Sequence, residues 1–261
     1  MSETTDLLKA HVKGYSRKDG VYVRPHDRAG MPSMTTASKP VGPVHYHPRR
    51  GENGEKVIVK TPTMQSLPST WHNPRAVATF VPDGDAPASI NNIPLTKWRD
   101  HPQTNMGGDF CDGINEDLEE PDFLLPPGKK AGSGVVIEEP DGRVWVIAPT
   151  NAYGGYETTF PKGTAEPDLS LQGNALKECF EEAGLQVEIT GFIGDFARTT
   201  SVARMYSARR VGGTPIAASW ESQGVMLVPR DKLRDMLNMW SDQAVVDAIA
   251  GETDPSKVAA E

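Results

Sequence analysis

The C-terminal half of this chain is predicted to form an α/β fold, a mixed β-sheet sandwiched between helices. An irregular N-terminal extension rich in Pro and Gly precedes it. Apolar runs at 134–137 and 144–148 flank the turn sequence Pro140-Asp141-Gly142-Arg143, a pattern typical of a β-hairpin. Residues 170–183 have helical spacing and end at Gly184, a common helix C-cap. Strands interleaved with helices favour a layered α/β fold.

The later elements follow the same pattern. Residues 187–194, 205–211 and 225–228 are apolar runs of strand length. Pro229 then opens a stretch with helical spacing that extends to about Ala250, and Pro is favoured in the first turn of a helix. We therefore expect one helix between the early strands and a second helix at the end of the domain.

The N-terminal half is less regular. Asp19-Gly20 between two strand-like runs predicts a hairpin, although a solvated tail is the simpler alternative. His45 and His47 alternate as on a strand, but no acidic or cysteine neighbour supports a metal site. Trp71 and Trp98 are expected to pack the extension onto the main domain. These features divide the chain into a weakly ordered segment (1–54), an extension (55–128), the main domain (129–250) and a flexible tail (251–261).

Composition limits the classes of function. The chain has 261 residues, a net charge of −8 and no strongly basic block, which argues against an extended nucleic-acid surface. A small anionic substrate remains compatible, because one local pocket can reverse the overall sign of charge. Cys111 and Cys179 lack the spacing of a zinc site or a disulfide framework. No signal-peptide or membrane-spanning run is evident, so we expect a cytoplasmic protein, with a homodimer left open.

One segment carries a chemical pattern. Phe160-Pro161-Lys162-Gly163 is followed by a helix on which Glu178, Glu181 and Glu182 occupy positions i, i+3 and i+4. Carboxylates at this spacing share one helical face and repel each other. Such a face is explained if a hard cation such as Mg²⁺ or Mn²⁺ lies there. Taken alone, the three residues also fit an ordinary solvated helical face.

The wider spacing resembles the Nudix hydrolase family, whose box reads G-x5-E-x7-R-E-U-x-E-E-x-G-U, with U a bulky aliphatic residue. Gly163, the three glutamates, Gly184 and Leu185 match it. Five Gly and Glu matches at fixed spacing occur by chance in about 10⁻⁶ of windows. The resemblance implies a Nudix fold and hydrolysis of a diphosphate bond, with Glu178, Glu181 and Glu182 binding Mg²⁺ or Mn²⁺.

Two positions depart from the box. Leu169 stands at its first Glu, and Lys177 stands at its Arg. In the family these two residues usually pair and orient the metal ligands. Both have changed together here, and Asp168 is the partner we expect for Lys177. Cys179 occupies the apolar position of the box, where a small buried residue is expected.

The resemblance also implies the remaining site residues. Glu221 lies where many Nudix enzymes place an additional acidic ligand or base, and Glu166 lies close enough in sequence to reach the metal edge. The predicted substrate-binding residues are Lys162, Gly163, Arg198 and Arg204. The aromatic residues that could stack on a base, or simply pack, are Tyr153, Tyr156 and Trp220.

These residues predict a metal-dependent pyrophosphohydrolase. Its substrate would be a nucleoside diphosphate linked to another group, ADP-ribose-like or a dinucleotide. Two alternatives stay open: a Nudix module that binds nucleotides without hydrolysis, and a hydrolase of diphosphoinositol-type substrates, because that branch often carries a Phe-Pro-Lys-Gly sequence. Retention of all three helical glutamates argues against the first alternative.

Overall fold

The computed structural model describes residues 10–12, 15–16, 22–23, 26–28, 44–102 and 112–251. They fall into two units, residues 1–44 and 45–261. In the first unit, β1 (Ala10–Val12) pairs antiparallel with β4 (His26–Arg28), and β2 (Tyr15–Ser16) pairs antiparallel with β3 (Tyr22–Val23). The predicted turn at Asp19-Gly20, residues 252–261 and Cys111 lie outside the described residues.

The second unit is built on a seven-stranded mixed sheet in the order β13-β14-β10-β11-β15-β7, with β12 paired to β10. Only the β10–β14 pair is parallel among these strands, and the other pairs are antiparallel. The strands are β7 (Ala78–Phe80), β10 (Lys130–Glu138), β11 (Arg143–Pro149), β12 (Lys162–Thr164), β13 (Leu185–Ala197), β14 (Ser201–Gly213) and β15 (Ser222–Pro229). The predicted hairpin around Asp141-Gly142 is formed by β10 and β11.

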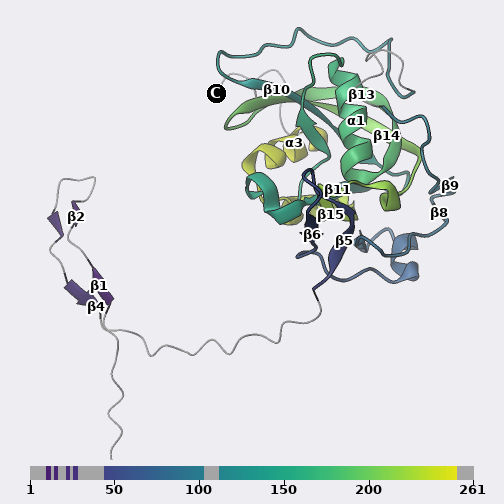
Figure 1. The fold of residues 1–261 in the computed structure, drawn as a ribbon. Helices are drawn as coiled ribbons and strands as arrows, with labels where there is room; N and C mark the ends of the chain where they lie inside the picture. Colours follow the sequence, from purple (N-terminus) through teal and green to yellow (C-terminus); the bar gives the residue numbers. More distant parts are fainter. Residues whose placement is uncertain are drawn as a thin grey trace, which may run out of the picture. The chain divides into compact units, whose positions relative to one another are not determined.

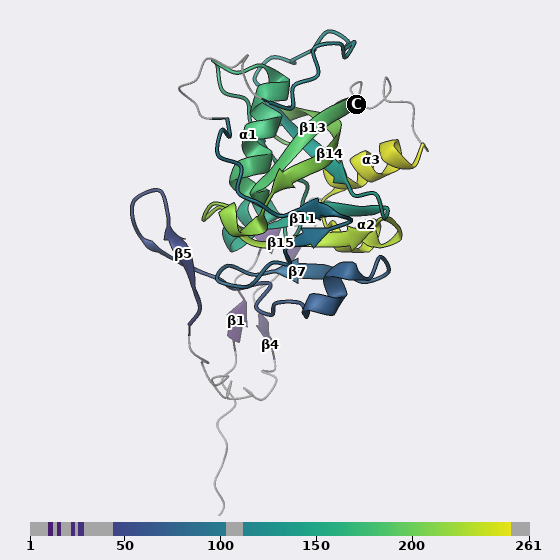
Figure 2. The ribbon, with the colours of Figure 1, turned by 90° about the vertical axis from the view of Figure 1, so that its right-hand side faces the viewer.

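Helices cover both faces of this sheet, as predicted (Figures 1 and 2). Along β10 and β11, alternate side chains enter two separate cores: Val135 and Trp145 lie in one, and Val136 and Val146 lie in the other. The helix α1 (Leu171–Ala183) packs on the first face, while α2 (Leu233–Met236) and α3 (Trp240–Ala250) pack on the second. No helix of the described residues is long and apolar enough to cross a bilayer.

The ends of α1 are set by its sequence. The Ser170 hydroxyl accepts a hydrogen bond from the Gly173 N–H at 3.0 Å, which satisfies one free amide of the first turn. Gly184 ends the helix in the left-handed conformation, with φ of 71°. A side chain at this position would also meet the backbone of residues 214–218. The predicted helix is therefore confirmed at both ends.

The C-terminal helix is a correction to the prediction. Pro229 ends β15, and the chain continues through η4 (Arg230–Lys232) and α2 before it breaks and restarts as α3. Leu237 is extended and buried in the core. The Asn238 side chain donates to the Gly155 carbonyl at 2.8 Å and accepts from the Glu157 N–H at 2.9 Å. The sequence keeps its helical spacing across Leu237 and Asn238, but these tertiary contacts interrupt the helix there.

The extension belongs to the same unit as the main domain. The hairpin of β5 (Tyr46–Arg50) and β6 (Lys56–Ile58) spans the boundary that we expected after residue 54, and the division between units lies at residue 44 instead. Beyond it, η1 (Pro68–His72), β8 (Ser89–Ile90) and β9 (Ile93–Pro94) lead along the domain. Trp71 packs on Trp145 with ring centroids 6.0 Å apart, and Trp98 packs edge-on against Phe180 at 5.8 Å. Both tryptophans therefore anchor the extension.

Candidate active site

The first half of the site is the contact between β12 and α1. Gly163 on β12 faces Glu178 so closely that a Cβ atom at residue 163 would collide with the Glu178 carboxyl group. One turn further along α1, the Glu182 Oε2 atom accepts a hydrogen bond from the Lys162 N–H at 2.7 Å. The β12 loop therefore packs directly on the glutamates of α1, with no room for a side chain at Gly163.

The carboxyl groups on α1 have unusual pKa values. Burial, and next the negative charge of Glu182, raises the pKa of Glu178 to about 8. Burial also raises the pKa of Glu182 to about 7, against the opposing attraction of Lys162. Metal-free protein therefore holds protons here at neutral pH, and a divalent cation would displace them.

Glu221 lies near this face, because its charge acts on Glu178 and Glu182. It precedes β15, and its carbonyl accepts a hydrogen bond from the Thr150 N–H at 2.6 Å. Desolvation, and next the charge of Glu181, raises the pKa of Glu221. The segment is tied to α1 because the Ser219 N–H donates to the Glu181 carbonyl at 2.6 Å. The four predicted acids, Glu178, Glu181, Glu182 and Glu221, therefore act on one another electrostatically.

These acids suit a hard cation in the type of their donor atoms, which are carboxylate oxygens. Within the part of the chain that the structure describes, no three His, Cys, Asp or Glu side chains converge tightly enough to hold an ion by themselves. Mg²⁺ commonly keeps several waters and is shared between one or two carboxylates and substrate phosphates. The residues present therefore fit an ion that is completed by water and by a bound diphosphate.

Lys177 does not pair with Asp168, contrary to our expectation. Its Nζ atom lies 3.1 Å from Glu166 and 2.7 Å from Glu181. Glu166 is drawn to the helix because its N–H donates to the Asn174 side chain at 3.1 Å, one turn before Lys177. Glu166 therefore replaces the missing first Glu of the pattern as the partner of the basic residue. Lys177 in turn holds Glu181 at i+4.

A buried acid that the sequence analysis missed lies behind the loop. Asp242, on α3, has no exposed surface and accepts a hydrogen bond from the Thr159 hydroxyl at 2.5 Å. The Lys162 ammonium lies 3.8 Å from Asp242, and the Arg198 guanidinium lies 3.4 Å from it. Burial lowers the pKa of Lys162 to about 8. The only sequence signal for Asp242 was an acidic residue in the first turn of a helix, which is common.

The predicted aromatic residues and Arg204 lie in different surroundings from one another. Tyr156 lies under the Lys162 ammonium, 4.3 Å from ring centroid to Nζ, and close to Arg198. Tyr153 is exposed, and Trp220 is partly buried. Arg204 is not brought to the carboxylates of α1: it forms ion pairs with Asp195 at 2.7 Å and Glu120 at 2.9 Å. These contacts favour a structural role for Arg204.

Comparisons with known proteins bear on this arrangement. The family model described as NUDIX domain matches residues 128–248. An ADP-ribose pyrophosphatase structure from Streptococcus suis is 18% identical, covers 48% of this chain and 93% of its own, and has a TM-score of 0.38. A NUDIX hydrolase structure from Nitrosomonas europaea is 16% identical, covers 49% and 93%, and has a TM-score of 0.40. These identities and TM-scores are too low to bear on the chemistry of this chain.

A comparison with curated proteins gave no match. The family match begins just before β10 and ends within α3, so it includes the whole box from Gly163 to Leu185. It confirms the predicted resemblance to the Nudix hydrolases. The C-terminal part of the chain, residues 128–248, belongs to the NUDIX domain family.

Proposed function

We propose that this chain is a metal-dependent pyrophosphohydrolase that cleaves the diphosphate of a nucleoside diphosphate linked to another group. The observation that carries the proposal is the crowding of Glu178, Glu182 and Glu221 with too little positive charge among them. Holding carboxylates close together, with Glu178 buried and Glu182 half-buried, is costly unless a cation compensates them. A NUDIX domain that keeps all three helical glutamates of the box is a natural place for such a cation.

Glu178, Glu181 and Glu182 would hold Mg²⁺ or Mn²⁺, which when bound neutralises the charge of a diphosphate and activates a water. Lys162 and Arg198 bring positive charge to the other side of the loop, where Asp242 orients them. With a pKa near 8, Lys162 is still mostly protonated at neutral pH and can donate to a phosphate oxygen. Glu221, whose pKa is raised, is the residue we assign to proton acceptance.

The test is a screen of diphosphate compounds with the full chain. ADP-ribose, dinucleoside polyphosphates, nucleoside triphosphates and diphosphoinositols are incubated with Mg²⁺ or Mn²⁺, and the products are identified by mass spectrometry. We expect a nucleoside monophosphate and a phosphorylated remainder from a linked nucleoside diphosphate, with activity lost in EDTA and restored by excess metal. Glu188→Gln, on β13 in an exposed pair with Arg209, is a matched control for changes to the acids of α1.

The other outcomes separate the alternatives. Cleavage restricted to diphosphoinositols would replace the nucleotide substrate class. Binding of nucleotides without any cleavage in either metal would replace hydrolysis by a binding function. We further expect a cytoplasmic location, which fractionation of cells would check. A homodimer is also possible within this proposal, and light scattering of the purified chain would detect it.

A further inference from the structure

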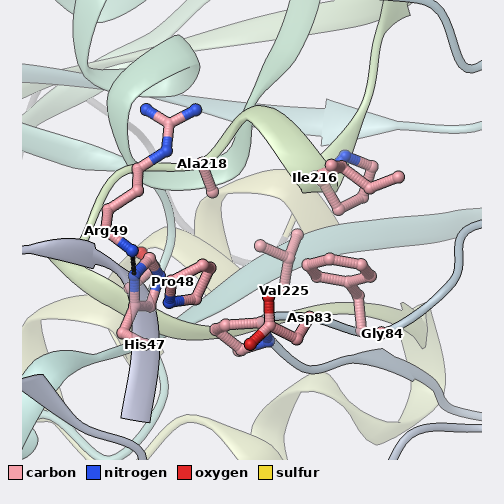
Figure 3. A pocket seen from close by; sticks show the side chains of 13 residues that line it. His47, Pro48, Arg49, Asp83, Gly84, Ile216, Ala218 and Val225 are labelled. Carbon is pink, nitrogen blue, oxygen red and sulfur yellow. Dashed lines mark hydrogen bonds between the residues drawn. The ribbon is translucent and has the colours of Figure 1, made fainter.

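A cavity of about 350 Å³ lies where the extension meets the NUDIX domain. Its walls come from β5, from the loop after β7, from η3 (Pro215–Ala217) and from the start of β15. Figure 3 shows His47, Pro48 and Arg49 on one side and Ile216 and Val225 on the other. Seven of the thirteen lining residues therefore lie outside the matched family region of 128–248.

The walls are suited to a flat apolar ring. Pro48 and Pro82 contribute rigid rings, and Phe80 and Val225 are neighbours across the β7–β15 pair. Ile216 also lines the cavity, although about half of its surface is exposed to solvent. An exposed large aliphatic side chain beside buried apolar residues is a typical lining for a ligand pocket.

Two polar groups in the cavity have unused hydrogen-bonding capacity. The Ser222 hydroxyl is buried and has no hydrogen-bond partner among the described residues. Arg49 forms no ion pair with any acid in the described part of the chain, and only its backbone N–H is engaged, by the His47 Nδ1 atom at 3.0 Å. Burial lowers the pKa of His47, so this histidine adds no charge at neutral pH. Arg49 is therefore the cation of the cavity.

The cavity shares a segment of the chain, residues 218–222, with the candidate active site. Ala218 lines it, and the adjacent Ser219 donates its N–H to the Glu181 carbonyl. Ser222 also lines it, directly after Glu221. The Arg49 side chain passes Ala218 at the edge of the cavity (Figure 3). A molecule in the cavity would therefore lie next to the segment that carries Glu221.

We propose that the extension completes a nucleoside-binding subsite in this cavity. A nucleobase lies between the proline, Phe80 and Ile216 walls and bonds to the Ser222 hydroxyl, while Arg49 binds the phosphate next to that nucleoside. This inference rests on the proposed function and names its substrate class. One free arginine accompanied by Asp83 suits one or two phosphates far better than a polyphosphorylated inositol ring.

The test measures binding of AMP and UMP to the full chain by calorimetry in EDTA, so that binding at the acids of α1 does not mask the subsite. Arg49→Glu is compared with Arg50→Glu, the adjacent exposed residue on β5, which does not line the cavity and changes the net charge equally. We expect Arg49→Glu to weaken nucleotide binding about tenfold or more, because an ionic hydrogen bond is lost, and Arg50→Glu to have little effect. Ribose 5-phosphate should bind more weakly than AMP.

A second pair of variants tests the buried hydroxyl. Ser222→Ala is expected to weaken binding about threefold or more. Thr214→Val removes another buried hydroxyl without a partner, one that does not line the cavity, and should leave binding unchanged. In the hydrolysis assay with Mg²⁺, Arg49→Glu should raise KM while kcat stays within a few-fold of the parental value.

The outcomes are distinguishable from those of the proposed function. If neither nucleotide binds the parental chain at millimolar concentration, or if Arg49→Glu and Arg50→Glu behave alike in binding and in KM, the subsite is wrong even where diphosphates are hydrolysed. If the parental chain binds nucleotides in an Arg49-dependent manner but cleaves no diphosphate, the subsite stands and the hydrolytic function fails.

Discussion

Glu139 and Glu178 are two buried glutamates in opposite electrostatic surroundings. Glu139 accepts hydrogen bonds from the Trp145 indole at 2.8 Å and from the Asn91 amide at 2.9 Å, and it forms a fully buried ion pair with Arg210. Glu178 accepts no hydrogen bond from any described residue and is repelled by Glu182. One carboxylate is compensated by the protein, and the other is not.

The difference distinguishes a carboxylate with a structural role, Glu139, from one that is available to bind a ligand, Glu178. The neighbours of Glu139 come from the extension, β11 and β14, so this glutamate fastens three parts of the fold together. Because these neighbours already neutralise and hydrogen-bond its carboxylate, we expect Glu139 to bind no further ligand. Glu178 keeps oxygen atoms available, which is the state expected of a ligand for an ion that arrives from solution.

Glu182→Gln is expected to lower turnover on the order of 10³-fold, because loss of a metal ligand misplaces the activated water. Gln keeps the oxygen that accepts the Lys162 N–H, so the fold should be retained. Steady-state rates with Mg²⁺ and thermal unfolding measure the two effects. Glu188→Gln should match the parent in both. Near-parental turnover by a folded Glu182→Gln protein would exclude a metal centre on α1.

Glu139→Gln should show the reverse pattern. It leaves the Arg210 charge buried without a counter-charge, and we expect a loss of about 3 kcal/mol in unfolding free energy. This is the lower end for a broken buried pair, because Gln can still accept from Trp145 or Asn91. Denaturant unfolding gives the value, and kcat per folded molecule should remain unchanged. If turnover falls as far as in Glu182→Gln, the contrast between the two acids is mistaken.

The pH dependence of stability should differ between Glu178 and its uncharged mimic. The raised pKa means that folded, metal-free protein binds this proton more tightly than the unfolded chain does, so Glu178 loses its stabilising proton as pH rises through about 8. Glu178→Gln should match the parent near pH 5 and exceed it by up to about 4 kcal/mol near pH 8. Chemical unfolding in EDTA at both pH values measures this. A pH-independent difference would argue against the raised pKa.

The smallest effect concerns the partner of Lys177. A double-mutant cycle of Lys177→Met and Glu166→Gln should give a coupling of about 0.5–1 kcal/mol, the range for partly exposed ion pairs. Asp168→Asn combined with Lys177→Met should be additive, because Asp168 is not within ion-pair distance of Lys177. Unfolding free energies supply both cycles. Coupling to Asp168 instead would restore the pairing expected from the sequence.

The parts of the molecule that were predictable are those governed by nearby residues. Periodicity and turn residues predicted the β10–β11 hairpin, and Ser170 and Gly184 predicted the limits of α1. The shared face of Glu178, Glu181 and Glu182 followed from helical spacing alone.

The parts that were missed depend on residues distant in sequence. Asp242 reaches Lys162 only because α3 packs behind the loop, 80 residues later. Lys177 selects Glu166 because Asn174 holds that segment to the helix, which adjacency in sequence does not reveal. Arg49 and Ser222 line the same cavity although they are 173 residues apart in the sequence. No local pattern predicts such contacts.

The strand β7 has a further consequence. It supplies backbone hydrogen-bonding partners for residues 225–227 of β15, at the border of the sheet. A protein trimmed to the family region would leave this border bare, and a bare strand border is a template on which other chains can assemble. By pairing with β15, the three residues Ala78–Phe80 are expected to keep that strand from pairing with other chains. Expression of residues 128–248 alone would remove β7 together with one wall of the cavity.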